Sequence, residues 1–151
     1  MHFEDGEIPV SLGYGISGNK RPITIITKSV STTGTVVYCG IFEGNPLKSV
    51  YIGRDIVSDE MEAKPFGYFN DLNSVVFGKK VTTIENGAFE GSSAISSVTS
   101  LNIIPLVCLS VSTFDDAVYK NATLYVPKAS IGRYATADVW NKFESVAVFG
   151  V

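Results

Sequence analysis

The chain has 151 residues, 45% of them hydrophobic, and a formal net charge of −3. The length fits one domain, and the hydrophobic content excludes a disordered chain. Because only 18% of the residues are charged and the balance is negative, a basic face for nucleic acid or for an anionic membrane is not expected.

Two features bear on location. The longest apolar run, from Leu101 to Val111, is too short to cross a bilayer of ~30 Å, so no membrane span is expected. The first residues lack a basic region followed by an apolar one, which is the pattern of a signal peptide. We therefore expect either an intracellular protein or a trimmed piece of a longer one.

Residues 1–40 predict irregular strands that form a first, imperfect repeat. Glycines at Gly13, Gly15 and Gly18 have the spacing of a dinucleotide-binding loop, but the β-branched run Ile23–Thr27 follows where a helix is needed. We interpret them as a loop between strands. A second strand is predicted at Thr35–Tyr38, after a polar turn over residues 28–34.

Residues 41–112 contain a repeated apolar pattern. The pattern Leu-x-x-Val-x-Phe occurs at 72–77, appears as Leu-x-x-Val-x-Ile at 47–52, and is degraded at 95–100, which gives steps of 25 and 23 residues. Leucine-rich repeats have such periods. Each unit is a short strand followed by a turn or helical segment, so the pattern predicts a β-rich α/β repeat fold.

A Phe followed two residues later by Gly occurs in two units, as Phe42 with Gly44 and as Phe89 with Gly91. We expect the Phe to fill the core from a short helical turn. The Gly would then end that turn in a left-handed conformation.

Residues 113–151 predict a C-terminal cap, with a loop over 113–122. A final strand is expected at Thr123–Pro127, and a helix is expected to start at Ser130 with Trp140 and Phe143 on its apolar side. Asp138 could restart this helix, and weak alternation over 144–149 favours one terminal strand.

Few residues carry reactive chemistry. The only histidine is His2, and neither Cys39 nor Cys108 has an activating partner in the sequence, so we expect no catalytic residues, no metal site and no cofactor. The two cysteines are interpreted as buried thiols, with a disulfide as the alternative. The pair Asp115 and Asp116 is expected to hold the local backbone rather than to act as catalytic carboxylates. The acidic residues between 59 and 62 are interpreted as a solvated loop rather than a cation site.

The Phe-x-Gly units, the repeated strands and above all the tail from Thr113 to Pro127, with Tyr134 and the Trp140–Phe143 segment, resemble the BspA-like leucine-rich repeat proteins of Bacteroidales. The resemblance covers residues 41 to 145. It implies a right-handed leucine-rich-repeat solenoid closed by a capping helix. It also implies secretion or bacterial cell-surface attachment, and adhesion or binding of host proteins.

Outward-facing positions of the predicted strands are the candidate ligand-binding residues, because strand side chains alternate between two faces. They are Ser49, Tyr51, Ser74, Val76, Ser97, Thr99, Thr123 and Tyr125. The expected partner is a host or extracellular-matrix protein, or a glycan. Three alternatives remain open: an ordinary solvated sheet, a structural cap or spacer of a longer repeat protein, and a dimer through an open N-terminal strand edge.

Overall fold

The computed structural model describes residues 2–3, 10–12, 29–30, 36–37, 48–58, 64 and 66–149. Several predictions lie outside the described residues: the Gly13–Gly18 loop, the strand at 23–27, the Phe42 and Gly44 pair, Cys39, and the acidic loop at 59–62. Their structure is therefore not considered further.

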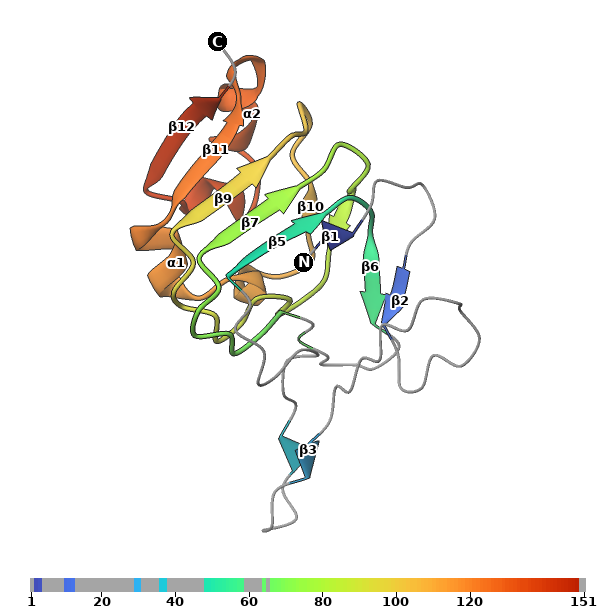
Figure 1. Cartoon of the computed structure of the whole chain (residues 1–151). Helices are drawn as coiled ribbons and strands as arrows, with labels where there is room; N and C mark the ends of the chain where they lie inside the picture. Colours follow the sequence, from blue (N-terminus) through green and yellow to red (C-terminus); the bar gives the residue numbers. More distant parts are fainter. Residues whose placement is uncertain are drawn as a thin grey trace.

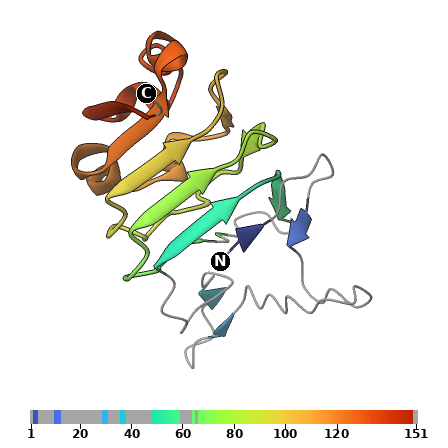
Figure 2. The same cartoon turned by 45° about the horizontal axis from the view of Figure 1, so that its top comes forward.

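A six-stranded sheet dominates the fold (Figure 1), and all its neighbouring strands pair in parallel. In spatial order its strands are β1 (His2–Phe3), β5 (Ser49–Ile52), β7 (Ser74–Phe77), β9 (Ser97–Ser100), β11 (Thr123–Pro127) and β12 (Ser145–Phe149). Spatial order therefore follows chain order. Figure 2 shows the strands from β5 to β11 side by side and pointing in one direction.

Three two-stranded sheets accompany the main sheet. They are β2 (Val10–Leu12) with β6 (Ile56–Ser58), β3 (Ser29–Val30) with β4 (Val36–Val37), and β8 (Thr83–Ile84) with β10 (Val107–Cys108). Strand β3 lies within the segment that we expected to be only a turn, and it pairs antiparallel with β4.

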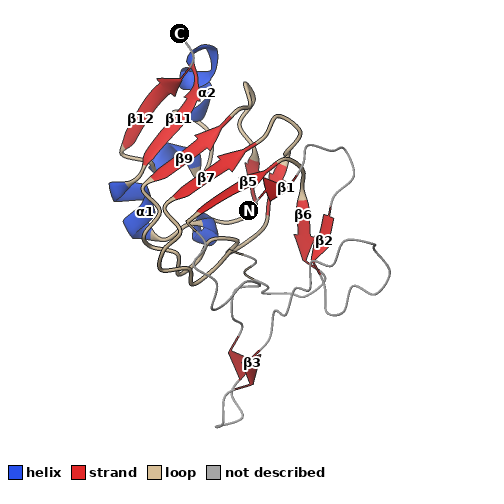
Figure 3. Cartoon of the chain, in the orientation of Figure 1, coloured by secondary structure: helices blue, strands red, loops and turns tan. Residues whose placement is uncertain are grey.

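The helical segments are short. They are η1 (Val111–Thr113), α1 (Asp116–Asn121), η2 (Lys128–Ser130), α2 (Ile131–Tyr134) and η3 (Trp140–Lys142). In the view of Figure 3, α1 and β10 lie behind the main sheet. The opposite face of the sheet, turned toward the viewer, is called the outer face below.

The core lies between the sheet and this back layer. Val75, Val98 and Leu124 point inward from the middle of the sheet and are fully buried. Opposite them, Phe89 is stacked between Phe66 and Phe114, with ring centroids 5.2 and 5.1 Å apart. The expectation that Phe89 fills the core is confirmed, and Gly91 does adopt a left-handed conformation, with φ +80°.

The expected right-handed leucine-rich-repeat solenoid is wrong. The structure is a small α/β domain with one large parallel sheet and few helices. The apolar repeat sets the positions of β5, β7 and β9, but the intervening segments differ from one another: β8 follows β7, whereas β10, η1 and α1 follow β9. A fixed spacing of apolar residues therefore predicts strand register without fixing how the connections fold.

The C-terminal prediction is right for the strands and for a helix that starts after Ser130, and it is wrong for the segment 113–122. A second short helix, η3, follows Asp138, where a restart was predicted. Strands β11 and β12 lie where they were expected, but the segment 113–122 contains helix α1 rather than only a loop. The expected capping helix is interrupted, since α2 ends at Tyr134 and Val139 has a positive φ of 70°. Val139 directly precedes η3. The first residue of η3, Trp140, is buried and donates from Nε1 to the carbonyl of Leu106 (2.8 Å). The Ser130 hydroxyl donates to the carbonyl of Pro127 instead of capping a helix.

Candidate functional site

The outer face of the sheet brings the candidate residues together in two rows. One row crosses the strands through Tyr51, Val76, Thr99 and Tyr125, which are direct register partners. The second row contains only hydroxyl side chains, from Ser49 through Ser74 and Ser97 to Thr123. All eight side chains are exposed or half-buried. The predicted register of these residues is therefore confirmed, whereas their role in binding stays a prediction.

Strand β12 extends both rows. Ser145 pairs with Thr123 and Ala147 pairs with Tyr125, while Phe149 begins a third row beside Pro127. The Thr123 and Ser145 hydroxyl oxygens lie 3.4 Å apart, within hydrogen-bond distance. Sequence reasoning missed these three positions, although the alternation over 144–149 that predicted the strand was the available signal.

The outer face carries no charged side chain in these rows. Neighbouring strands lie about 4.8 Å apart, so the hydroxyl row from β5 to β12 spans about 19 Å, and Tyr51 and Tyr125 are about 14 Å apart. Hydroxyl groups can donate and accept hydrogen bonds, and tyrosine adds a rigid apolar ring with a polar tip. The two rows thus combine hydroxyl groups with two tyrosine rings.

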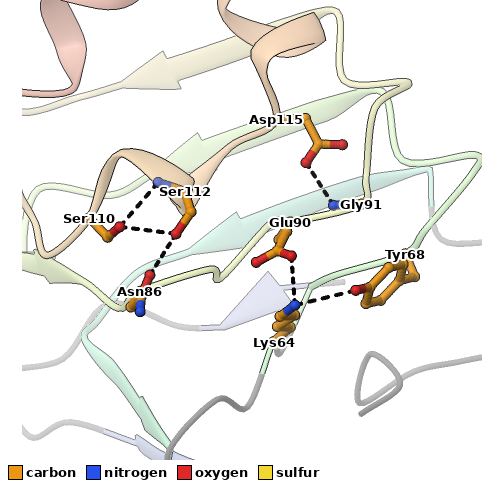
Figure 4. A network of polar contacts seen from close by, with 8 residues as sticks. All are labelled: Lys64, Tyr68, Asn86, Glu90, Gly91, Ser110, Ser112 and Asp115. Atoms are coloured by element: carbon orange, nitrogen blue, oxygen red, sulfur yellow. Dashed lines mark hydrogen bonds and ion pairs between the residues drawn. The ribbon is translucent and has the colours of Figure 1, made fainter. Parts of the chain in front are cut away.

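A polar network below the sheet stabilises the turn around Phe89 (Figure 4). Lys64 Nζ forms an ion pair with Glu90 Oε1 at 2.7 Å and donates to the Tyr68 hydroxyl at 3.3 Å. Burial lowers the pKa of Lys64, but its hydrogen bonds to Glu90 and Tyr68 and the Glu90 charge outweigh this effect, so the pKa is raised. The backbone N–H of Gly91 donates to Asp115 Oδ1 at 2.9 Å.

Asp115 therefore holds backbone, as predicted, but the backbone belongs to a turn 24 residues away rather than to its own segment. Its side chain makes no cap bond to helix α1, which begins at Asp116. These contacts explain the Asp115 and Asp116 pair structurally, and nothing in them positions two facing carboxylates for catalysis.

Two buried tyrosines and the partly buried thiol of Cys108 have raised pKa values. Burial raises the pKa of the Cys108 thiol to about 12, and Cys108 is a free cysteine. Burial also raises the pKa of Tyr119 and of Tyr134, although for Tyr134 a hydrogen bond with the Ser100 hydroxyl (2.6 Å) opposes the shift. These groups stay protonated at neutral pH, so the Cys108 thiol is a poor nucleophile.

Other kinds of site receive no support in the described part of the chain. No group of three or more His, Cys, Asp or Glu residues there could hold a metal ion. A small apolar pocket beside Phe89 and Phe77 encloses about 20 Å³, which is room for roughly one water molecule and far too little for a cofactor. None of the helices among these residues has the length and apolar character that crossing a bilayer requires.

Comparisons with protein-family models, with curated proteins and with solved structures give no match to this chain. The fold and the outer face define the class only broadly, as a small α/β domain whose sheet presents rows of uncharged side chains.

Proposed function

We propose that the chain is a non-enzymatic binding module that recognises a host or extracellular protein through the outer face of its sheet. The observation that supports this most directly is the register that aligns Tyr51, Val76, Thr99 and Tyr125 in one row. Tyrosine is enriched at binding hot spots because its ring gives a large contact area with few rotatable bonds. A bacterial cell-surface location belongs to this proposal and rests on the resemblance to BspA-like proteins.

The size of the face sets the expected affinity. Rows on one face are about 6.7 Å apart along a strand, so the two rows that cross all five strands span about 19 by 7 Å, or roughly 130 Å². A standard protein interface buries about 800 Å² on each partner. We therefore expect the outer face alone to support weak binding, with flanking loops or a second copy needed for tight binding.

A glycan is the second candidate ligand. The specific observation in its favour is the row of five hydroxyl side chains, which runs from Ser49 to Ser145 at the regular spacing of the strands. A linear glycan lying across the strands would meet a hydroxyl at each step and the Tyr51 and Tyr125 rings beside it. The two candidates thus use the same face and are separated only by experiment.

The test is binding of the purified chain to a panel of extracellular-matrix proteins and glycans, with a Tyr51→Ala/Tyr125→Ala variant beside it. Ile104→Ala is the control, because Ile104 is 71% exposed and lies outside these rows. Saturable binding that is lost only in the double variant, with its folding intact, supports the outer face. Binding that survives the double variant refutes it.

The ligand panel distinguishes the remaining functional hypotheses. Binding to glycans but not to proteins selects the second candidate. Binding to neither favours a structural cap or spacer. A dimer through the N-terminal edge of β5 stays a prediction, and part of that edge is occupied, since His2 and Phe3 of β1 pair with Tyr51 and Ile52.

A further inference from the structure

The inner face of the sheet is uncovered at its last strand. One inner row runs through Val50, Val75, Val98 and Leu124, each at most 2% exposed, and ends at Val146, which is 36% exposed. The apolar row thus continues one strand beyond the layer that covers it.

The next inner row repeats this result. Its members Ile52, Phe77, Ser100 and Val126 are at most 4% exposed, whereas Val148, the register partner of Val126, is 46% exposed. Both rows become exposed at the same strand. The inner face of β12 as a whole is therefore uncovered, rather than one of its side chains.

Strand β12 is also an edge strand. Among the described residues it pairs with β11 alone and stands last in the sheet. Edge strands are normally protected by charged residues, proline or a bulge, because their free N–H and C=O groups can pair with another strand. The sequence Ser-Val-Ala-Val-Phe over 145–149 contains neither a charge nor a proline.

The strand is complementary to itself. Antiparallel pairing centred on Ala147 would set Val146 of one copy opposite Val148 of the other, and Ser145 opposite Phe149. Residues directly opposite each other in an antiparallel pair point to the same face, so the four valines would meet on the inner side. The nearest charge, Glu144, lies outside the paired segment 145–149, so no like charges would face each other within it.

We propose that two copies of this chain associate through β12, by antiparallel pairing about Ala147 on a two-fold axis, to form one continuous sheet. A two-fold axis uses the same surface on both subunits, as this self-complementary strand requires. The contact is smaller than a standard interface, so the dimer dissociates on dilution. The inference is independent of the ligand that the outer face binds.

A second exposed apolar strip is the competing surface. It comprises Ile103, Ile104, Val107, Leu109 and Val111, all more than half exposed. Its strand, β10, has only two residues. Unlike the valines of β12, the side chains of this strip do not continue a row that is buried on the neighbouring strands. It therefore provides the matched control for the experiment.

Sedimentation velocity from about 1 µM to about 1 mM covers the range in which weak complexes dissociate. We expect a monomer–dimer equilibrium in the unmodified chain. Val148→Lys should shift dissociation to at least tenfold higher concentration, because it puts a charge into the joined valine cluster. Leu109→Lys should leave the equilibrium unchanged. Val148 is exposed, so folding of its variant is expected, and Trp140 fluorescence checks it.

Cross-linking tests the register. Residues opposite each other in an antiparallel pair have Cα atoms 4.5–5.5 Å apart, within the range of a disulfide. Ala147→Cys should therefore form a disulfide-linked dimer on mild oxidation, whereas Ser145→Cys should not, because position 145 faces position 149. A chain that stays monomeric at every concentration overturns the proposal, and so does a dimer lost in Leu109→Lys but kept in Val148→Lys.

Discussion

Replacing Phe89 with alanine tests whether the aromatic stack holds the sheet to its back layer. The Phe89 side chain is fully buried. Its ring stacks on Phe66 and Phe114 at interplanar angles of 17° and 10°, and meets the edge of Phe77 at a centroid distance of 5.9 Å. Removing it breaks three ring contacts and leaves a cavity in the centre of the core.

The expected cost is large compared with the stability of a small domain. A buried Phe→Ala change costs about 3–5 kcal/mol, from lost burial and from the cavity. Each aromatic pair adds about 0.5–1.5 kcal/mol beyond its buried area, which places Phe89→Ala in the upper half of that range. Because domains of this kind have a free energy of unfolding of about 5–15 kcal/mol, the variant should fold with little stability left.

Urea unfolding at neutral pH measures the effect. Trp140 is the only tryptophan and is 1% exposed, so its fluorescence reports loss of the core. Phe89→Leu keeps most of the volume and should cost roughly half as much, which keeps the test informative where the alanine variant fails to fold. Val76→Ala, on the outer face, should cost less than about 1 kcal/mol. A Phe89→Ala loss below about 1 kcal/mol, or one no larger than that of Val76→Ala, would refute the reasoning.

Two further predictions concern backbone strain and pH. Gly91→Ala should cost about 1–3 kcal/mol in unfolding free energy, because φ is +80° and the new Cβ would lie 2.4 Å from Tyr68 Cδ1; Tyr68→Gly should reduce that cost, and equal costs in both backgrounds would contradict the contact. Stability should fall as pH rises above about 9, because the pKa of the Cys108 thiol is raised from its ordinary 9.0 to about 12 in the folded chain. Its contribution is fully present below pH 9 and is lost toward pH 12, so Cys108→Ala should flatten the decline in urea midpoint over this range, and an unchanged decline would contradict it.

The sequence predicted strand positions better than connections. Val50, Val75 and Val98 recur at nearly equal spacing, and the alternation around them states which side chains point inward, so β5, β7 and β9 and their register could be predicted. The connections have no such periodicity. Helix α1 has six residues, which is too short for a helical period to stand out from the pattern of a loop.

The remaining differences depend on contacts between residues far apart in the sequence. Helix α2 ends at Tyr134, and Val139 then takes a positive φ just before η3. This backbone conformation accompanies the burial of Trp140, whose ring donates to the carbonyl of Leu106. The bond from the Gly91 N–H to Asp115 joins two turns. Neither is visible in a local pattern, because propensity describes a segment alone and tertiary packing overrides it.

The two surfaces argued above lie on one sheet, so their functions should be coupled. Pairing at β12 would place the outer faces of two copies side by side and double the area of roughly 130 Å² that one copy presents. A ligand long enough to contact both faces would then bind as to a linked pair of sites, with an avidity above that of one face.

Val148→Lys should therefore weaken binding to such a ligand, although Val148 lies on the inner side of β12 and touches no residue of the outer rows. At protein concentrations too low for the dimer to form, the unmodified chain and Val148→Lys should bind the ligand with the same affinity. A Val148→Lys loss that persists at those low concentrations would show that the two surfaces are not coupled through association.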